Sequence, residues 1–346
     1  MKRLEVFLLV LFVAGLTVVT AAAQARQTAP AGGSCDRACL LGIADSYFAA
    51  MAAHDPKRAP FAANVKFTEN TRVLPMGEGL WKNLLEGPTT FKIYVPDPVA
   101  GQIGFIGMLK ETPVASTATF SPAVAPAGGA QGGAPRGGGA APTGAIQLAL
   151  RLKVQNRQIT EAEHIVARIG QNNLANLQTP RPGLIAVVPP AERLSRDLML
   201  LIGNSYYDAI VQSNGNASPF ADDCERRENG MRTAGPGGTV TQGCRGQLTS
   251  RAMSYIQSID LRPVWIADEE TGLVFGLTMF RHPMEEKFVT LLNPDGTTTQ
   301  RPMNFNSFDF EAAHIFKIRG GKIHEIEAMG FSLPFHSKNG WSDFLR

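Results

Sequence analysis

Several features by which protein classes are recognised are scarce in this sequence. Its 346 residues include four cysteines and three tryptophans, the formal net charge is only +3, and Lys and Arg form no long run. This weak charge argues against nucleic acid or a membrane surface as a partner. Neither a CxxC nor an HxxxH spacing occurs, which argues against a zinc site. We expect neither a metal nor a cofactor.

Long apolar runs are also absent, except near the N-terminus. Lys2 and Arg3 precede an apolar run over residues 6–19, and small residues follow at 21–25. This order is typical of a secretory signal peptide, and we place its cleavage after Ala25. An uncleaved membrane anchor is the alternative, although the run is short for a spanning helix. Once residues 1–25 are removed, we expect an exported protein, periplasmic or secreted, that no longer contacts the membrane.

The expected export affects how the four cysteines are interpreted, because disulfides form in oxidising compartments. Cys35 and Cys39 lie four residues apart where a helical pattern begins, and Cys224 and Cys244 flank a Gly-rich loop. Four cysteines allow three pairings. In an oxidising compartment we favour the local pairing, Cys35–Cys39 with Cys224–Cys244, and free thiols are the alternative.

Two stretches of the chain share one spacing. Residues 47–70 read YFAAMAAHDPKRAPFAANVKFTEN, and residues 206–229 read YYDAIVQSNGNASPFADDCERREN. Tyr, Pro-Phe-Ala and Glu-Asn recur in both at a constant offset of 159 residues. A second match, at an offset of 164, aligns residues 152–163 with residues 316–327. This internal repeat indicates a duplicated domain.

The repeat predicts two domains, residues 34–170 and 194–346, joined by a Pro-rich linker over residues 171–193. An Ala/Gly/Pro-rich stretch at residues 121–144 interrupts the first domain. Because this stretch has little to bury, we predict a disordered loop there.

Each domain begins with a helical pattern and continues with strands. In the first domain, apolar residues recur at three- to four-residue steps from Leu40 to Met51. The helix is expected to end at His54-Asp55-Pro56, and a helical turn at 60–62 to precede a strand at 65–69. We expect further strands at 101–110, 145–154, 158–168, 261–268, 272–281, 286–292, 308–319 and 322–332, with hairpin turns at 155–157 and 319–321. Helices followed by an antiparallel sheet indicate an α+β fold.

These segments resemble a known superfamily. PFAANVKFTEN (60–70), PFADDCERREN (219–229) and FKIRGGKIHEIEAMG (316–330) are similar to passages of nuclear-transport-factor-2-like proteins, which include SnoaL-like cyclases and ketosteroid isomerase. The resemblance implies two tandem cone-shaped domains, each with N-terminal helices packed on a curved antiparallel sheet around a pocket. This fold hosts isomerases, dehydratases, cyclases, hydrolases and binding modules, so the resemblance leaves the activity open.

The resemblance to ketosteroid isomerase also implies site residues. In that enzyme a helix tyrosine and a protonated aspartate donate hydrogen bonds to the oxyanion, and a second aspartate shuttles the proton. The matching positions here are Tyr47 and Tyr206, then His314 in the second domain with Leu150 in the first, and Glu69 and Glu228. Glu and His in place of the two aspartates argue against steroid isomerisation itself.

The surroundings of these residues suggest further ligand contacts. Glu69 shares its strand face with Val65 and Phe67, so the carboxylate lies either at an exposed strand end or in an apolar cavity. On the corresponding face of the second domain, Arg226 is placed to form an ion pair with Glu228. The predicted ligand-binding residues are Trp81, His164, Arg168, Arg226, Asn70 and Asn229.

Structural roles are the alternatives for most of these positions. The two tyrosines would pack the first helix of each domain, Trp81 would fill the core, and each Glu-Asn pair would cap its strand through local hydrogen bonds. His164 and Arg168 alternate along one strand, and periodicity leaves open whether their face meets a pocket or solvent. We expect a solvated face for Glu161, Glu163, Glu325 and Glu327.

Three functions are consistent with these observations. The favoured one is a cofactor-independent lyase or isomerase that uses a pocket carboxylate as a general base on a small organic substrate. The second is a non-catalytic protein that binds a small ligand. In the third, the two domains pair through their sheets as an intramolecular pseudo-dimer with filled interiors. Pairing of this kind would leave the protein monomeric.

Overall fold

The computed structural model describes residues 35–113, 144–237, 243–261 and 266–341. The predicted signal peptide and residues 121–143 of the predicted disordered loop lie outside these ranges. The described residues belong to one compact unit. None of the helices in these ranges combines the length and apolar character that a membrane span requires.

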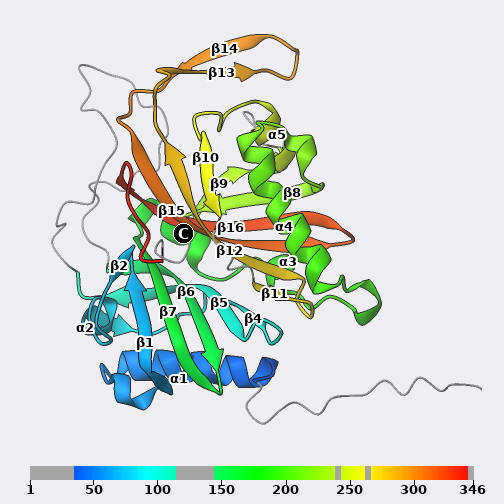
Figure 1. Cartoon of the computed structure of the whole chain (residues 1–346). Coiled ribbons are helices and arrows are strands. Elements are labelled where there is room, and N and C mark those ends of the chain that lie inside the picture. Colours follow the sequence, from blue (N-terminus) through cyan, green and yellow to red (C-terminus); the bar gives the residue numbers. More distant parts are fainter. Residues whose placement is uncertain (1–34, 114–143, 238–242, 262–265, 342–346) are drawn as a thin grey trace, which may run out of the picture. The chain divides into compact units, whose positions relative to one another are not determined.

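The first half consists of one long helix and a sheet (Figure 1). Its sheet has the strand order β2-β1-β7-β6-β5-β3, and β4 pairs with β5. The elements are α1 (Arg37–Ala52), η1 (Pro56–Arg58), β1 (Phe61–Glu69), β2 (Arg72–Val73), α2 (Leu80–Asn83), β3 (Leu84–Glu86), β4 (Lys92–Asp97), β5 (Gln102–Glu111), β6 (Ala145–Gln155) and β7 (Gln158–Arg168).

The ends of α1 follow from local chemistry. Asp36 caps the helix by accepting a hydrogen bond from the backbone N–H of Cys39 at 2.8 Å. At the other end, His54 adopts a φ of 52°, which ends the helical conformation. The helical turn predicted at 60–62 is wrong. It lies at η1, because proline suits the first helical position, and Phe61 already begins β1.

The second half repeats this plan. Its strand order, β9-β8-β16-β15-β12-β10 with β11 on β12, matches that of the first sheet position by position. The elements are α4 (Arg196–Val211), η4 (Gly215–Ala217), β8 (Phe220–Glu228), β9 (Met231–Ala234), α5 (Gly243–Thr249), β10 (Ser258–Leu261), β11 (Ile266–Asp268), β12 (Leu273–His282), β13 (Phe288–Leu292), β14 (Thr298–Pro302), β15 (Phe308–Arg319) and β16 (Lys322–Pro334).

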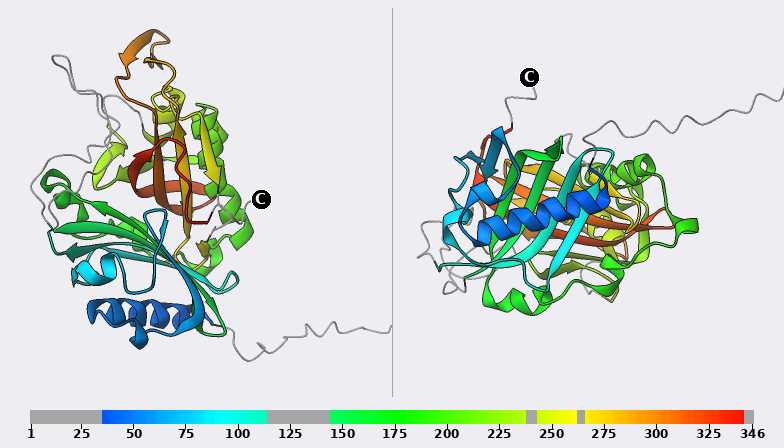
Figure 2. Two further views of the ribbon diagram at one scale, coloured as in Figure 1. Left: turned by 60° about the vertical axis from the view of Figure 1, so that its left-hand side comes forward. Right: turned by 90° about the horizontal axis from the view of Figure 1, so that it is seen from below.

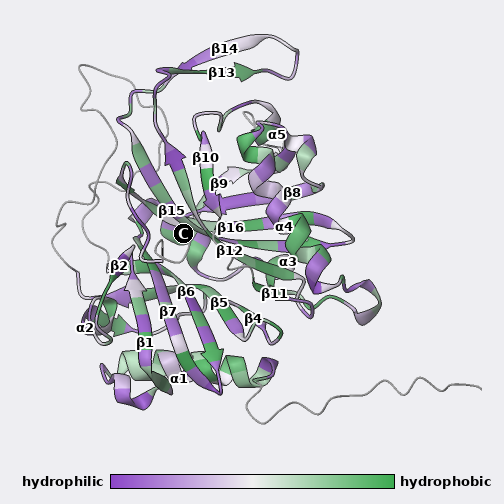
Figure 3. Cartoon of the chain, viewed as in Figure 1, coloured by the Kyte–Doolittle hydropathy of each residue, from purple (hydrophilic) through white to green (hydrophobic). Residues whose placement is uncertain are grey.

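The expected α+β fold with two curved, mainly antiparallel sheets is confirmed. Each sheet also contains one parallel pairing, β1 with β7 and β8 with β16. The single strand expected at 261–268 is instead two strands, β10 and β11. A separate two-stranded ribbon, β13 with β14, lies between β12 and β15 in the chain. In this ribbon β13 is the more hydrophobic strand and β14 the more hydrophilic (Figure 3).

The two sheets pack against each other through the faces that point away from α1 and α4 (Figure 2). One apolar cluster joins them, with Ile106 and Ile165 from the first sheet and Phe275, Ile315 and Met329 from the second. The approach is close at Gly104, where a Cβ atom would lie 2.5 Å from the Phe275 ring. The described part is therefore layered as helix, sheet, sheet and helix.

The chain crosses between the halves twice. After β7, the linker forms η2 (Gln171–Leu177), α3 (Pro182–Ile185) and η3 (Pro190–Glu192), and Asn173 donates to the Asn229 carbonyl at 3.0 Å. After β16, the tail returns to the first half, where the Trp341 Nε1 donates to the Thr68 hydroxyl at 3.0 Å. The Trp341 ring also lies against Lys66 and Arg151. The linker, which follows the first sheet, thus contacts the second half, and the tail, which follows the second sheet, contacts the first half.

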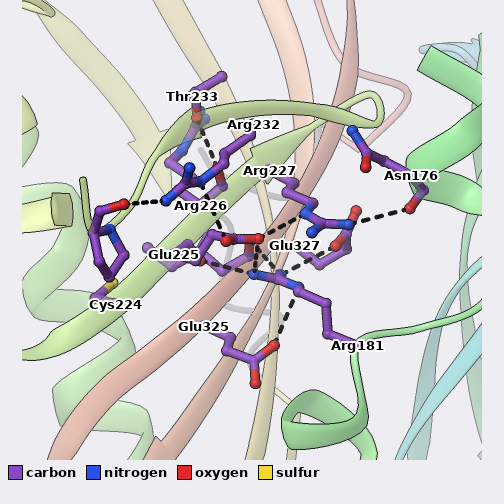
Figure 4. A network of polar contacts seen from close by, with 12 residues as sticks. Asn176, Arg181, Cys224, Glu225, Arg226, Arg227, Arg232, Thr233, Glu325 and Glu327 are labelled. Carbon is purple, nitrogen blue, oxygen red and sulfur yellow. Dashed lines mark hydrogen bonds and ion pairs between the residues drawn. The ribbon is translucent and has the colours of Figure 1, made fainter. Parts of the chain in front are cut away.

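The expectation of a solvated face for the four glutamates is wrong. Glu163 and Glu327 are buried, because this face lies between the two sheets. Arg151 binds Glu161 and Glu163 in the first half. In the second half, Arg181 of the linker binds Glu225, Glu325 and Glu327 at 3.4, 3.1 and 3.2 Å (Figure 4).

Replacing Trp341 tests the role of the returning tail. We expect Trp341→Ala to lower the free energy of unfolding by about 3 kcal/mol, because it removes a buried aromatic side chain from the first sheet. The midpoint of urea denaturation measures this loss. Val99→Ala is the control, since Val99 is 81% exposed. A Trp341 variant as stable as this control would contradict the assignment.

Glu327 predicts a specific dependence of stability on pH. Burial raises the pKa of its carboxyl from 4.5 to about 7, although the charge of Arg181 opposes the rise. The folded protein therefore holds this proton more tightly than the unfolded chain. The resulting stability is complete below the unfolded pKa and is lost as the pH rises through the folded one.

Glu327→Gln removes this titration. From about pH 4 to about pH 8, we expect the free energy of unfolding of the wild type to fall by up to about 3 kcal/mol relative to the variant. Urea denaturation of both proteins at several pH values measures the difference. A difference that stays constant across this range would refute the prediction.

Candidate functional site

In the first half, three predicted site residues form a hydrogen-bonded chain. α1 supplies Tyr47, the end of β1 supplies Glu69, and the parallel register places His164 of β7 directly beside Glu69. His164 Nδ1 lies 3.1 Å from Glu69 Oε2, and its Nε2 lies 2.8 Å from the Tyr47 hydroxyl. The imidazole therefore connects the carboxylate to the phenol.

This first-half site is closed. The Trp81 indole N–H donates to the Tyr47 hydroxyl at 3.3 Å, and both side chains are buried. Glu69 also accepts from the backbone N–H of Leu80 at 2.9 Å. Burial raises the pKa of Tyr47, so the phenol stays neutral. Trp81 thus lies in the core, and the polar atoms of this chain already have partners within the protein.

In the second half, an arginine occupies the connecting position. Arg226 donates from Nε to the Tyr206 hydroxyl at 2.9 Å and from Nη1 to the Thr233 hydroxyl at 2.7 Å. Its Nη2 forms the expected ion pair with Glu228. Arg226 occupies the strand position that Phe67 has in β1, because Tyr47 and Tyr206 share the same offset. A cationic side chain from β8 thus connects the tyrosine to the glutamate in the second half, as His164 from β7 does in the first.

A second phenol and His314 lie beside this group. The Tyr207 hydroxyl is 3.2 Å from His314 Nδ1, and both side chains are fully buried. Burial lowers the pKa of His314 well below its ordinary value, and the charge of Arg226 lowers it further, so the ring is neutral. Among the described residues, no hydrogen-bond partner lies within reach of His314 Nε2.

His164 and His314 belong to equivalent cross-strand pairs of the two sheets, but they lie on opposite strands of the pair. Leu150 faces His164 across β6 and β7, whereas His314 faces Ala328 across β15 and β16. An imidazole thus enters each interior at the same place in the sheet. Alignment of the repeat by itself pairs His314 with Leu150 and hides this relation.

Tyr255 is partly buried and packs against the hydrophobic core of the second half. Burial raises the pKa of Tyr255, the charge of Glu228 raises it further, and the charges of Arg301 and Arg226 oppose this rise. A depression of about 80 Å³ lies here, lined by Tyr255, Met284, Phe288 and Val289 among others. A larger one, of about 410 Å³, lies elsewhere, between Asp260, Arg281 and the tail residues 335–339.

Three other predicted site residues have different surroundings. Asn70 accepts a hydrogen bond from the Val166 N–H at 2.7 Å, and Asn229 accepts one from the Gly330 N–H at 3.1 Å. Both side chains extend the parallel pairing of their strands. Arg168 is paired with Glu111 and has a 46% exposed side chain. Although it lies on the same strand face as His164, it is not brought to the Tyr47 chain.

The predicted disulfides, Cys35–Cys39 and Cys224–Cys244, are confirmed. The second ties α5 to β8 at Cys224, which lies two residues before Arg226 and on the same strand face. In the described ranges, no group of three or more His, Cys, Asp or Glu side chains is placed to hold a metal ion.

Four residues of the second interior were missed by the sequence analysis: Tyr207, Thr233, Tyr255 and Arg301. Tyr207 follows Tyr206 directly, so the doubled tyrosine was an available signal. The other three lie in segments that are not part of the repeat, and only the fold brings them to this place.

A family model described as a domain of unknown function (DUF8021) matches residues 192–330, which is less than half of the chain. No curated protein matches the sequence.

Among solved structures, the chain is similar to an NTF-2-like protein of unknown function from Burkholderia xenovorans LB400, with 14% identity and a TM-score of 0.25 over 43% of this chain and 94% of that one. A protein of unknown function with a cystatin-like fold from Methylobium petroleophilum PM1 has 14% identity and a TM-score of 0.26, covering 42% of this chain and 81% of that one. An LEH-like epoxide hydrolase of M. tuberculosis has 12% identity and a TM-score of 0.24, covering 41% and 85%. These values are too low to support an argument about function.

Replacing Glu69 tests the structural role of the first chain. We expect Glu69→Gln to lower the free energy of unfolding by about 1–2 kcal/mol, because the neutral amide is a weaker acceptor for Leu80 and His164. Glu78→Gln is the matched control, since Glu78 forms an exposed i,i+4 ion pair with Lys82. Equal stability of the two variants in urea would show that the Glu69 contacts do not support the fold.

Proposed function

We propose that the protein is an exported, tandem member of the nuclear-transport-factor-2-like superfamily. Its domains, at residues 34–170 and 194–346, would form an intramolecular pseudo-dimer joined by the linker 171–193. The sequence resemblance, the matching strand order and the shared apolar cluster between the sheets support this proposal. The two disulfides are in keeping with export from the cytosol, after cleavage at residue 25.

We further propose that the second domain is a cofactor-independent lyase or isomerase for a small organic substrate, and that the first domain is its structural partner. One observation carries this assignment. The polar atoms of the Tyr47–His164–Glu69 chain are satisfied by the protein, whereas His314 Nε2 is buried and has no partner in the described ranges. A buried polar atom without a protein partner can be satisfied by a bound ligand or an ordered water, and this one belongs to a side chain that lies beside Tyr206 and Tyr207.

The reaction would be a proton transfer next to a carbonyl. Glu228 takes the proton from the carbon, and negative charge develops on the carbonyl oxygen. When Tyr207 donates its hydroxyl hydrogen to His314 Nδ1, the neutral ring carries its own hydrogen on Nε2 and can donate it to that oxygen. Return of the proton to another carbon gives isomerisation, and departure of a neighbouring leaving group gives elimination.

Arg226 and Tyr206 would hold the base in place. The Arg226 guanidinium binds Glu228 and Tyr206 together, so the carboxylate is fixed in position. A carboxylate base suits substrates whose proton is already activated by a neighbouring carbonyl.

Deuterium exchange tests the proposal without knowledge of the natural substrate. Small ketones, 2-oxo acids and 3-oxo acids are incubated with the protein in D₂O, and proton NMR follows loss of the signal next to the carbonyl. We expect Glu228→Gln to lower the exchange rate by at least about 100-fold, since it removes the general base. Glu69→Gln is the matched control and should retain the wild-type rate.

Two results would contradict this assignment. Exchange that survives in Glu228→Gln excludes this carboxylate as the base, and exchange lost only in Glu69→Gln places the reaction in the first domain. Binding of these compounds with no exchange would favour a ligand-binding protein.

A further inference from the structure

The β13–β14 ribbon turns one face toward the second interior. Val289 and Met303 are buried in the hydrophobic core of this half, whereas Phe288 is 53% exposed. Arg301 lies directly opposite Val289 in the antiparallel register. Residues opposite each other in such a pair have their side chains on the same face. The Arg301 side chain is therefore on the inward face of the ribbon.

Arg301 is a half-buried cation that lacks a counterion. Its Nη2 donates to the Ala252 carbonyl at 2.7 Å, while Nε is buried without a hydrogen-bond partner. No carboxylate of the described residues forms an ion pair with it, in contrast to Arg226 and its partner Glu228. A guanidinium withdrawn from water without an acidic partner is costly, so an anion bound there would be stabilised.

Arg301 lies next to the small depression, because its partner across the ribbon, Val289, lines it together with Tyr255. The Tyr255 phenol is within electrostatic reach of Arg301 and also of Arg226 and Glu228. The ionised groups around Tyr255 thus carry two positive charges and one negative charge. Glu285 and Glu286 border the same depression, but both are exposed to solvent, where water screens their charge. One positive charge remains uncompensated.

We propose that Arg301 is the carboxylate-binding residue of the second domain, and that the substrate is a small organic monoanion. This inference rests on the proposed function and deepens it. The planar guanidinium suits a carboxylate, which it can bind through two parallel hydrogen bonds. A substrate carboxylate held by Arg301 would place the neighbouring carbonyl carbon toward Glu228 and His314. The β13–β14 ribbon then supplies specificity, and the β8 and β15 strands supply the acid–base groups.

Acetate and acetamide test this subsite, because they differ in charge and are nearly equal in size. The full mature protein is titrated with each compound at constant ionic strength, and the melting temperature reports binding. We expect acetate to raise the melting temperature of the wild type and acetamide to leave it unchanged. Arg301→Gln should weaken acetate binding by about tenfold, as expected for loss of one charge-assisted contact. Arg301→Lys, which keeps the charge, should retain part of it.

Lys322→Gln is the charge-matched control, since Lys322 is an exposed cation at the β15–β16 turn. It should bind acetate as the wild type does. Equal acetate binding by Arg301→Gln and the wild type would overturn the proposal, and so would the absence of an acetate-specific shift in the wild type.

Failure of this subsite can be told from failure of the proposed catalysis. Glu228→Gln removes the base and leaves Arg301 in place, so it should bind acetate while losing deuterium exchange. If acetate binds through Arg301 and no compound is exchanged, the anion subsite stands and the catalytic proposal fails. If exchange depends on Glu228 but is equally fast for oxo acids and their methyl esters, and Arg301→Gln changes neither rate, the catalytic proposal stands and the anion subsite fails.

Discussion

Face-to-face packing of the two sheets is the constraint on which the rest of this structure depends. Each sheet has a face covered by its own helix and a face covered by the other sheet. Charged groups on the shared faces are removed from water, and they persist only where an opposite charge meets them. Arg151 in the first half and Arg181 from the linker meet this requirement for the buried glutamates. The crossing of the linker and of the C-terminal tail follows from the same need to cover both sheets.

Within this frame the two interiors share one geometrical arrangement and differ in the residues that form it. A phenol on the first helix and a glutamate at the end of the first strand are joined through a nitrogen-bearing side chain in both halves. In the first half that side chain is His164, and the adjoining space is filled by Trp81. In the second half that side chain is Arg226, which comes from β8 and takes the connecting role of His164. The histidine of this half, His314, comes from β15 instead. Arg226 thus stands in β8 where β1 has Phe67, and His314 Nε2 beside it lacks the partner that the polar atoms of the Tyr47–His164–Glu69 chain have.

The sequence predicted features that depend on near neighbours in the chain. Positive φ angles at Asn156 and Arg157, and at Gly320 and Gly321, form the tight turns between the last two strands of each half. The disulfides were predictable because each joins residues that are close along the chain. The helical turn at 56–58 was misplaced by a few residues, since the proline at 56 and the proline at 60 are equally plausible starting points in sequence.

The sequence by itself thus determined the duplicated α+β plan, the disulfide pairs and the spacing that brings Tyr to Glu in each half, because these features rest on periodicity and short-range geometry. Only the tertiary structure decided which strand face meets solvent, which nitrogen-bearing side chain joins each Tyr to its Glu, and where Arg301 lies. These outcomes depend on contacts between residues far apart in the chain, such as His164 with Glu69 and Arg181 with Glu327. A pattern of alternation reads the same whether the second face of a strand is covered by water or by another sheet.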